Sequence, residues 1–187
     1  MLQVQTLEGE ARQFLPARVG GITLVVFWSM DVPATRAAGR YAADLSNIYG
    51  KMGLQVVGIV EKTVVPARTP EGQPIEGQVL EAYKYAPAFM TSQGMRYPVF
   101  YDDFTALRAM AKAAREKVGN DAPMFFLVDR QQRVRFSKLG FSFVGGVGAW
   151  SPGGWGAPPQ LTGEALIEIA ADGEHIRDYI EKLLKEQ

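Results

Sequence analysis

The 187-residue sequence contains no cysteine and only one histidine, His175. A thiolate is the group that attacks disulfides and peroxides, so the chain has no sulfur nucleophile for either reaction. The same absence excludes disulfide bonds and thiolate metal ligands, and one histidine cannot form a multi-histidine metal site. We therefore expect neither a bound metal nor another cofactor.

The sequence also lacks a charge excess, a long apolar run and a leader-like start. Twenty basic residues balance twenty acidic ones, which predicts no nucleic-acid partner. No run approaches the roughly 20 apolar residues of a membrane span, and residues 1–5 lack the basic and apolar segments of a signal peptide. The length and the 47% hydrophobic content suit one domain over residues 1–187, while the oligomeric state stays undefined.

Two apolar, β-branched runs flank a helical pattern in the first third of the chain. Residues 22–28 and 54–60 are nearly unbroken apolar runs, typical of strands buried on both faces. Strand, helix and strand at this spacing predict a parallel crossover unit. The predicted inward-facing helix residues are Ala38, Tyr41, Ala42, Leu45, Ile48 and Tyr49.

The middle of the chain is less regular. Residues 61–80 contain prolines and glycines without periodicity, which predicts an inserted loop. A helix over about 80–92 and a short extended piece at 97–101 follow. A second helix is predicted over about 104–118, and Asp102 precedes it as a carboxylate that caps the first turn.

The last third begins with an apolar strand at 122–129, which is entered through a proline. The alternating pattern at 134–139 predicts the edge strand of an antiparallel hairpin. A glycine-rich stretch over 140–159 precedes a helix at 174–185. The predicted class is therefore α/β, a central mixed sheet flanked by helices, with insertions at about 61–80 and 141–172.

Residues 24–36 read Leu-Val-Val-Phe-Trp-Ser-Met-Asp-Val-Pro-Ala-Thr-Arg. This segment resembles the strand and active-site turn of the thioredoxin-like superfamily, in its TlpA/ResA-like branch or its AhpC/TSA (redoxin) branch, where F-W-x-x-W-C-x-x-C-R is usual. Val32 and Thr35 stand where the two cysteines would be, and Asp31 replaces the tryptophan before them. The residues that match the pattern are Phe27, Trp28 and Arg36.

Other segments resemble the same superfamily and follow in its order. Residues 7–15 are similar to its N-terminal hairpin, and Tyr97-Pro98-Val99 with Asp102 resembles another of its segments. Ala122-Pro123 before an apolar strand resembles a segment that implies a cis peptide bond at Pro123, facing the turn. The resemblance implies a thioredoxin-like fold over about residues 5–60 and 80–140 and the last helix.

The resemblance also implies a groove between the turn and Pro123, where relatives hold extended peptides. Our first hypothesis is a peptide-binding, protein-binding or accessory module without thiol-disulfide or peroxidase activity of its own. It predicts an exposed apolar surface around Trp28, Val32 and Pro123. The candidate groove residues are Trp28, Asp31, Val32, Pro33, Ala34, Thr35, Arg36, Ala122 and Pro123.

An enzyme of unrecognised type that reuses this groove is the alternative hypothesis. It would use Asp31, Thr35 and Arg36 as its polar groups. A threonine nucleophile needs an adjacent general base, and no histidine is near in the sequence. A place at the start of the helix therefore suits Thr35 better, and a role in the turn suits Asp31.

The glycine-rich stretch adds a candidate partner loop that contains Trp150 and Trp155. Tryptophans on a segment of low charge present apolar area to a partner. The same side chains could instead fold over the sheet edge or the groove, and both interpretations stay open. The resemblance to TlpA/ResA-like proteins implies an extracytoplasmic location.

Overall fold

The structure is a computed structural model, and it describes residues 1–14, 21–118, 124–140, 142–144, 166–168, 170–171 and 174–186. Its centre is a seven-stranded mixed sheet. The pairs β3–β4 and β4–β7 are parallel, and the other pairs of the sheet are antiparallel. In spatial order the strands are β2 (Ala11–Phe14), β1 (Leu2–Gln5), β7 (Val99–Asp102), β4 (Leu54–Glu61), β3 (Ile22–Trp28), β8 (Met124–Val128) and β9 (Val134–Leu139).

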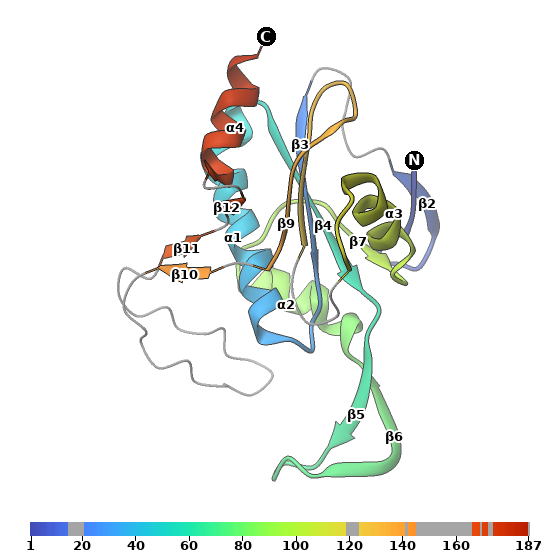
Figure 1. Cartoon of the computed structure of the whole chain (residues 1–187). Coiled ribbons are helices and arrows are strands. Elements are labelled where there is room, and N and C mark those ends of the chain that lie inside the picture. Colours follow the sequence, from blue (N-terminus) through green and yellow to red (C-terminus); the bar gives the residue numbers. More distant parts are fainter. Residues whose placement is uncertain are drawn as a thin grey trace.

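Helices cover both faces of this sheet (Figure 1). Alternate residues of β3 face opposite sides, and all seven are buried. One face packs against α1 (Pro33–Tyr49), α2 (Ala86–Ser92) and α4 (Ile176–Lys185). The other packs against α3 (Thr105–Ala114). The predicted mixed sheet flanked by helices is confirmed. No helix in the described ranges is both long and apolar enough to cross a membrane.

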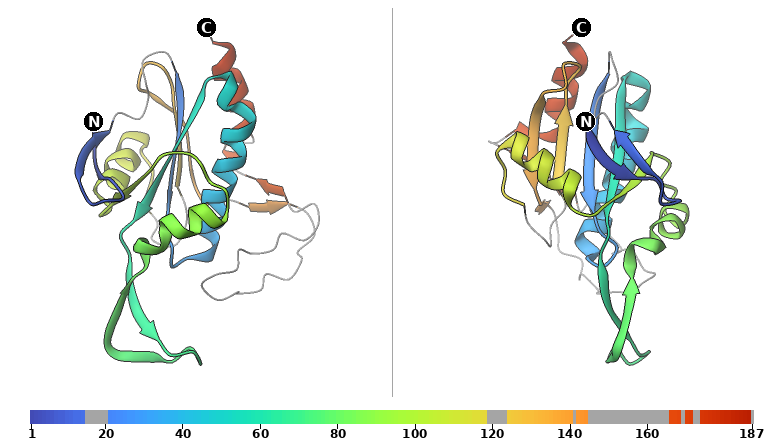
Figure 2. Two further views of the ribbon diagram at one scale, coloured as in Figure 1. Left: turned by 180° about the vertical axis from the view of Figure 1, so that it is seen from behind. Right: turned by 90° about the vertical axis from the view of Figure 1, so that its right-hand side faces the viewer.

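The expectation of an irregular loop at 61–80 is wrong. This segment forms an antiparallel ribbon, β5 (Val64–Arg68) and β6 (Pro74–Glu81), that projects from the sheet (Figures 1 and 2). We call it the arm. The sequence of the arm lacks the alternation of apolar and polar residues that marks a strand on a core, because most of the arm lies in solvent. Val64 and Val79, for example, are 55% and 69% exposed.

Other boundaries differ for local reasons. The helix expected at 80–92 begins as a short 3-10 turn at Ala82–Tyr85 and continues as α2, since residues 80 and 81 belong to β6. The helix expected at 104–118 ends at Ala114, because Arg115 adopts a left-handed conformation with φ 60°. Asp102 caps α3 as predicted, accepting from the backbone N–H groups of Ala106 and Leu107, each at 3.0 Å.

Among the predicted inward-facing residues of α1, only Ile48 is exposed. The helix continues into a 3-10 turn at Gly50–Met52, and the chain reverses at Gly53 with φ 107°. The described parts of the second insertion pair as β10 (Ser142–Val144) with β11 (Leu166–Glu168) and as β12 (Ala170–Ala171) with β13 (Glu174–His175).

Gly58 on β4 is the tightest backbone position in the sheet interior. A Cβ atom at Gly58 would lie 2.7 Å from the Tyr97 ring and 2.9 Å from a methyl group of Val99. The Tyr97 ring cannot move aside easily, because it is buried and its hydroxyl donates to the Gly39 carbonyl oxygen at 2.7 Å. A side chain at Gly58 would therefore displace the contact between β4, β7 and α1.

We expect Gly58→Ala to lower the free energy of unfolding by about 1–3 kcal/mol, the usual cost of overpacking a core. Urea denaturation measures this change. Gly50→Ala is the matched control: a Cβ there meets nothing closer than 4.0 Å and φ is −58°, so its stability should stay equal or rise slightly. Equal stability of the two variants would contradict the packing described.

Candidate functional site

The turn after β3 is closed by the hydroxyl group of Thr35. Its oxygen accepts from the Ser29 backbone N–H at 3.0 Å and lies 3.1 Å from the Ser29 hydroxyl. It faces two carbonyl acceptors, those of Ser29 at 2.7 Å and Val32 at 2.8 Å. Thr35 is 3% exposed. Its hydroxyl therefore ties the end of β3 to the first turn of α1 and is not presented as a nucleophile.

Val32 precedes α1 in an extended conformation and forms no side-chain cap. A thiolate in this place would gain from the positive end of the helix, whereas a valine side chain has nothing to ionise. Pro33 occupies the first turn, where its missing N–H costs nothing. The turn thus keeps a helix start but holds no titratable group at Val32.

Arg36 and Asp31 place opposite charges beside the turn. Arg36 is 6% exposed, and its guanidinium donates to the Met30 carbonyl oxygen. Burial lowers the pKa of Arg36, and the nearby Asp31 carboxylate opposes this shift. Asp31 Oδ1 accepts from the Thr63 hydroxyl at 2.7 Å. The Asp31 carboxylate is therefore shared between the turn and the base of the arm.

Glu61, the last residue of β4, is the most perturbed acid near the turn. It is 4% exposed, and no hydrogen bond from the described residues reaches its carboxylate. Burial raises the pKa of Glu61 to about 8, and the negative charges of Asp31 and Asp102 add to the rise. Glu61 is therefore largely protonated at neutral pH.

A groove of about 310 Å³ lies between the turn and the arm. The turn provides one wall and β5 provides the other, so residues far apart in the sequence meet there. Two arginines and one aspartate line it together with apolar side chains. The lining residues are Asp31, Pro33, Arg36, Val65, Pro66 and Arg68.

The structure brings together only some of the predicted groove residues. Asp31, Pro33 and Arg36 line the groove, and Thr35 is buried behind it. Trp28 was expected on an exposed apolar surface, which is wrong: it is buried and packs against Phe89, with ring centroids 5.9 Å apart. The strand alternation that turns Trp28 toward α1 and α2 explains this difference.

Several predictions concern residues outside the described ranges. These are the cis bond at Pro123, its neighbour Ala122 and the partner loop with Trp150 and Trp155. His175 is described: it caps α4, and its side chain accepts from the Arg177 backbone N–H at 3.2 Å.

Sequence reasoning missed the contribution of the arm and of Glu61. The arm was expected to be irregular, so Val65, Pro66 and Arg68 were not considered as lining residues. Glu61 follows the apolar run at 54–60, and the carboxyl ends of parallel strands meet at one edge of a sheet. That rule could have brought Glu61 beside the turn. Among the residues that the structure describes, no three acidic or histidine side chains form a candidate metal site.

No protein-family model and no curated protein matches the sequence. Solved structures do resemble it. A hypothetical protein from Sinorhizobium meliloti is 21% identical with a TM-score of 0.56, covering 100% of this chain and 81% of that chain. A thiol:disulfide interchange protein of the thioredoxin family from Chlorobium tepidum is 18% identical with a TM-score of 0.52, covering 74% and 82%.

The bacterioferritin comigratory protein of Xanthomonas campestris, whose structure was studied for alkyl peroxide reduction, is 17% identical with a TM-score of 0.51 and covers 74% of this chain and 80% of its own. Identities this low show a shared fold. The predicted fold class is confirmed: this chain has a thioredoxin-like fold, built from a sequence that contains no cysteine.

Proposed function

We propose that the protein is a binding module without redox activity of its own, and that the groove between the turn and the arm holds a peptide segment of a partner. The observation that carries this proposal is the groove itself, in which the buried Arg36 and the exposed Arg68 face a single aspartate. The proposal includes an extracytoplasmic site of action, which the resemblance to TlpA/ResA-like proteins implies.

The charges favour a segment that carries a carboxylate. Asp31 already accepts a hydrogen bond from Thr63. Within the described part of the chain, the Arg68 guanidinium donates to the Gly72 carbonyl oxygen at 2.7 Å and forms no ion pair. Two guanidinium groups opposite one shared carboxylate leave a positive balance in the groove. Arginine is well suited to bind carboxylates, because its planar fork donates two parallel hydrogen bonds.

The size and the walls favour a short segment over a bulky cofactor. About 310 Å³ lies at the lower end of the range for small-ligand sites. Pro33, Val65 and Pro66 give the walls an apolar character that suits aliphatic side chains of an extended chain. The turn is held by the Thr35 hydrogen bonds, so little order must be created when a ligand binds.

The peptide-binding proposal predicts a preference for free carboxylates. Each peptide of a set of labelled hexapeptides is made with a free C-terminal carboxylate and with a C-terminal amide, and binding is measured by fluorescence anisotropy. Among the peptides that bind, the carboxylate form should bind at least about fivefold more tightly than the amide form. Arg68→Ala should weaken binding of the carboxylate form about tenfold, since a charge-assisted hydrogen bond is lost.

Arg108→Ala, which removes an exposed arginine of α3 far from the groove lining, is the control and should leave affinity unchanged. Equal binding of acids and amides, or equal effects of the two variants, would contradict the proposal.

The absence of redox activity has its own test. The purified protein should not accelerate the reduction of insulin disulfides by dithiothreitol, because it holds no thiol. The double variant Val32→Cys/Thr35→Cys should accelerate it, since the first cysteine would precede the α1 N-terminus. Val32→Ser/Thr35→Ser should not. Turnover by the wild-type chain would refute the first part of the proposal.

A second candidate function is acid–base catalysis in the same region, and Glu61 is the observation that favours it. A carboxyl group that stays protonated near neutral pH can both donate and accept a proton in the working range. The hydroxyl group of Thr35, one of the three polar groups of the enzyme hypothesis, is hydrogen-bonded to backbone carbonyl groups. Glu61 is therefore the residue on which a catalytic function would depend.

The pKa of Glu61 can be tested through stability. Between pH 4.5 and about 8 the folded protein keeps a proton that the unfolded chain releases. The free energy of unfolding therefore falls as pH rises across this window. Glu61→Gln removes that dependence. The free energy of unfolding of the variant minus that of the wild type should therefore grow with pH, by at most about 5 kcal/mol in total above pH 8.

Urea denaturation from pH 5 to pH 9 measures this difference. Glu76→Gln, a substitution at an exposed position of the arm, is the control and should show a constant difference from the wild type. A constant difference for Glu61→Gln as well would show that Glu61 titrates normally, and it would remove the second candidate.

A further inference from the structure

The strand β9 forms one edge of the central sheet (Figures 1 and 2). Its inner edge pairs with β8, and no described strand pairs with its outer edge. The short β12–β13 ribbon lies beside it but is paired only within itself. An edge strand leaves alternate backbone N–H and C=O groups unpaired, and these groups are a template for an added strand.

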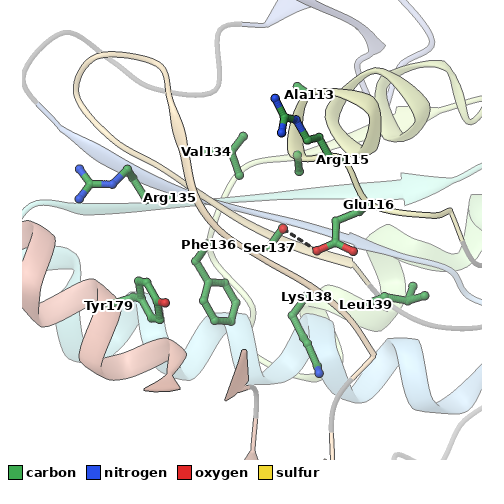
Figure 3. A pocket seen from close by; sticks show the side chains of 11 residues that line it. Ala113, Arg115, Glu116, Val134, Arg135, Phe136, Ser137, Lys138, Leu139 and Tyr179 are labelled. Carbon is green, nitrogen blue, oxygen red and sulfur yellow. Dashed lines mark hydrogen bonds between the residues drawn. The ribbon is translucent and has the colours of Figure 1, made fainter. Parts of the chain in front are cut away.

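A depression of about 590 Å³ runs along β9 and is distinct from the groove at the turn, with which it shares no lining residue. Figure 3 shows its walls, the end of α3 on one side and Tyr179 of α4 on the other. Phe136 packs against Tyr179 with ring centroids 5.0 Å apart. On the α3 side, the Ser137 hydroxyl donates to Glu116 at 2.8 Å. Both walls are therefore anchored to the strand.

Positive charge dominates the depression. Of its three cations, Arg135 is already paired, with Asp129 at 3.3 Å and Glu186 at 3.2 Å. Arg115 and Lys138 form no ion pair within the described residues, and Glu116, the only acid of the lining, is engaged by Ser137. A hydroxyl group does not neutralise a carboxylate, so Arg115 and Lys138 outnumber Glu116 two to one beside the open strand edge.

The backbone at Arg115 is a second, independent observation. Arg115 ends α3 with φ 60° and ψ 29°, a left-handed conformation that glycine adopts at least cost. An arginine is strained in this conformation relative to a glycine. Figure 3 places its guanidinium on the β9 side of α3, near Ala113 and across from Val134. A glycine at residue 115 would remove the backbone strain, whereas the arginine found there places a cation beside β9.

A second copy of this chain is a poor occupant for this edge. The charged residues of β9 are Arg135 and Lys138, both positive. Two β9 strands paired about a two-fold axis bring like charges together in the registers that place Arg135 or Lys138 opposite a cation of the other copy, which is destabilising. An acidic segment meets the opposite situation, because its carboxylates can pair with Arg115 and Lys138.

We infer that the outer edge of β9 binds an extended acidic peptide segment of another protein as an added strand. Main-chain hydrogen bonds to β9 supply affinity, and Arg115 and Lys138 select acidic side chains. These two cations lie on opposite sides of the strand, Arg115 on the side of α3 and Lys138 on the side of α1 (Figure 3), so acids at positions of either parity along the segment can be paired. The half-buried Tyr179, which packs on the buried Phe136, offers a contact for an apolar residue of the segment.

The test uses three labelled, acetylated heptapeptides and the full chain. The first has adjacent pairs of glutamate between valines, so that its carboxylates face both sides of the added strand. The second has lysine in place of glutamate, and the third is the first peptide with alternate backbone nitrogens methylated. Fluorescence anisotropy should show that the first peptide binds at least about tenfold more tightly than the other two. Only the first peptide offers carboxylates together with free backbone N–H groups.

Two variants locate the site. Arg115→Gly relieves the left-handed backbone, so its thermal stability should equal or exceed that of the wild type while its affinity falls about fivefold. Lys138→Glu should lower affinity about tenfold or more. Lys112→Glu, a charge reversal on the exposed side of α3 outside the lining, is the control and should change affinity by less than about twofold.

Four outcomes would overturn the inference. Equal binding of the methylated peptide would show attraction by charge without strand addition. Equal affinity of Arg115→Gly and the wild type would place the peptide elsewhere. A wild-type dimer that Lys138→Glu alters, measured by sedimentation, would make a second copy the occupant. Loss of binding in Arg68→Ala as well would assign the peptide to the groove at the turn.

Discussion

The burial of β3 on both faces is the constraint on which the rest of the described structure depends. All seven residues of this strand are buried, with β4 parallel on one side and β8 antiparallel on the other. A strand in that position must be almost entirely apolar, and Thr23 is the one residue of β3 with a polar side chain apart from the indole N–H of Trp28. Ser29 follows immediately, and its hydrogen bonds to Thr35 turn the chain directly into α1. The geometry of the turn is therefore a consequence of where β3 lies.

A turn of this kind usually serves thiol chemistry in proteins that share the fold, and here the same geometry holds other groups. Thr35 hydrogen-bonds to the backbone, Val32 cannot ionise, and the ionisable groups around the turn are Asp31, Arg36 and Glu61. Burial disfavours the charged form of both Glu61 and Arg36. It keeps Glu61 protonated, whereas Arg36 remains a cation whose guanidinium donates to a carbonyl oxygen. The region combines a neutral acid with a positive groove.

The sequence predicted the sheet well because the signal for β3 and β4 is local. An unbroken apolar run can only be a strand buried on both faces or a buried helix, and its length of seven or eight residues favours the strand. The arm was missed because a ribbon exposed to solvent need not alternate apolar and polar residues. Ile48 was predicted to face inward because helical spacing does not show where along α1 the contact with the sheet ends.

The candidate site was predictable only in part, for a related reason. Asp31 and Arg36 belong to a recognisable local segment, whereas the other wall of the groove comes from Val65, Pro66 and Arg68 on the arm. The raised pKa of Glu61 depends first on its burial and then on the charges of Asp31 and Asp102, thirty and forty-one residues away along the chain. Such couplings are set by tertiary structure and leave no trace in a short motif.

The arm divides the molecule into two cooperative units. Its outer half pairs only with itself, and a two-stranded ribbon is marginally stable alone. Amide protons of the arm can therefore exchange with solvent through local opening, while those of β3 exchange only when the whole sheet unfolds. A partner that orders the arm would slow the first kind of exchange without altering the second.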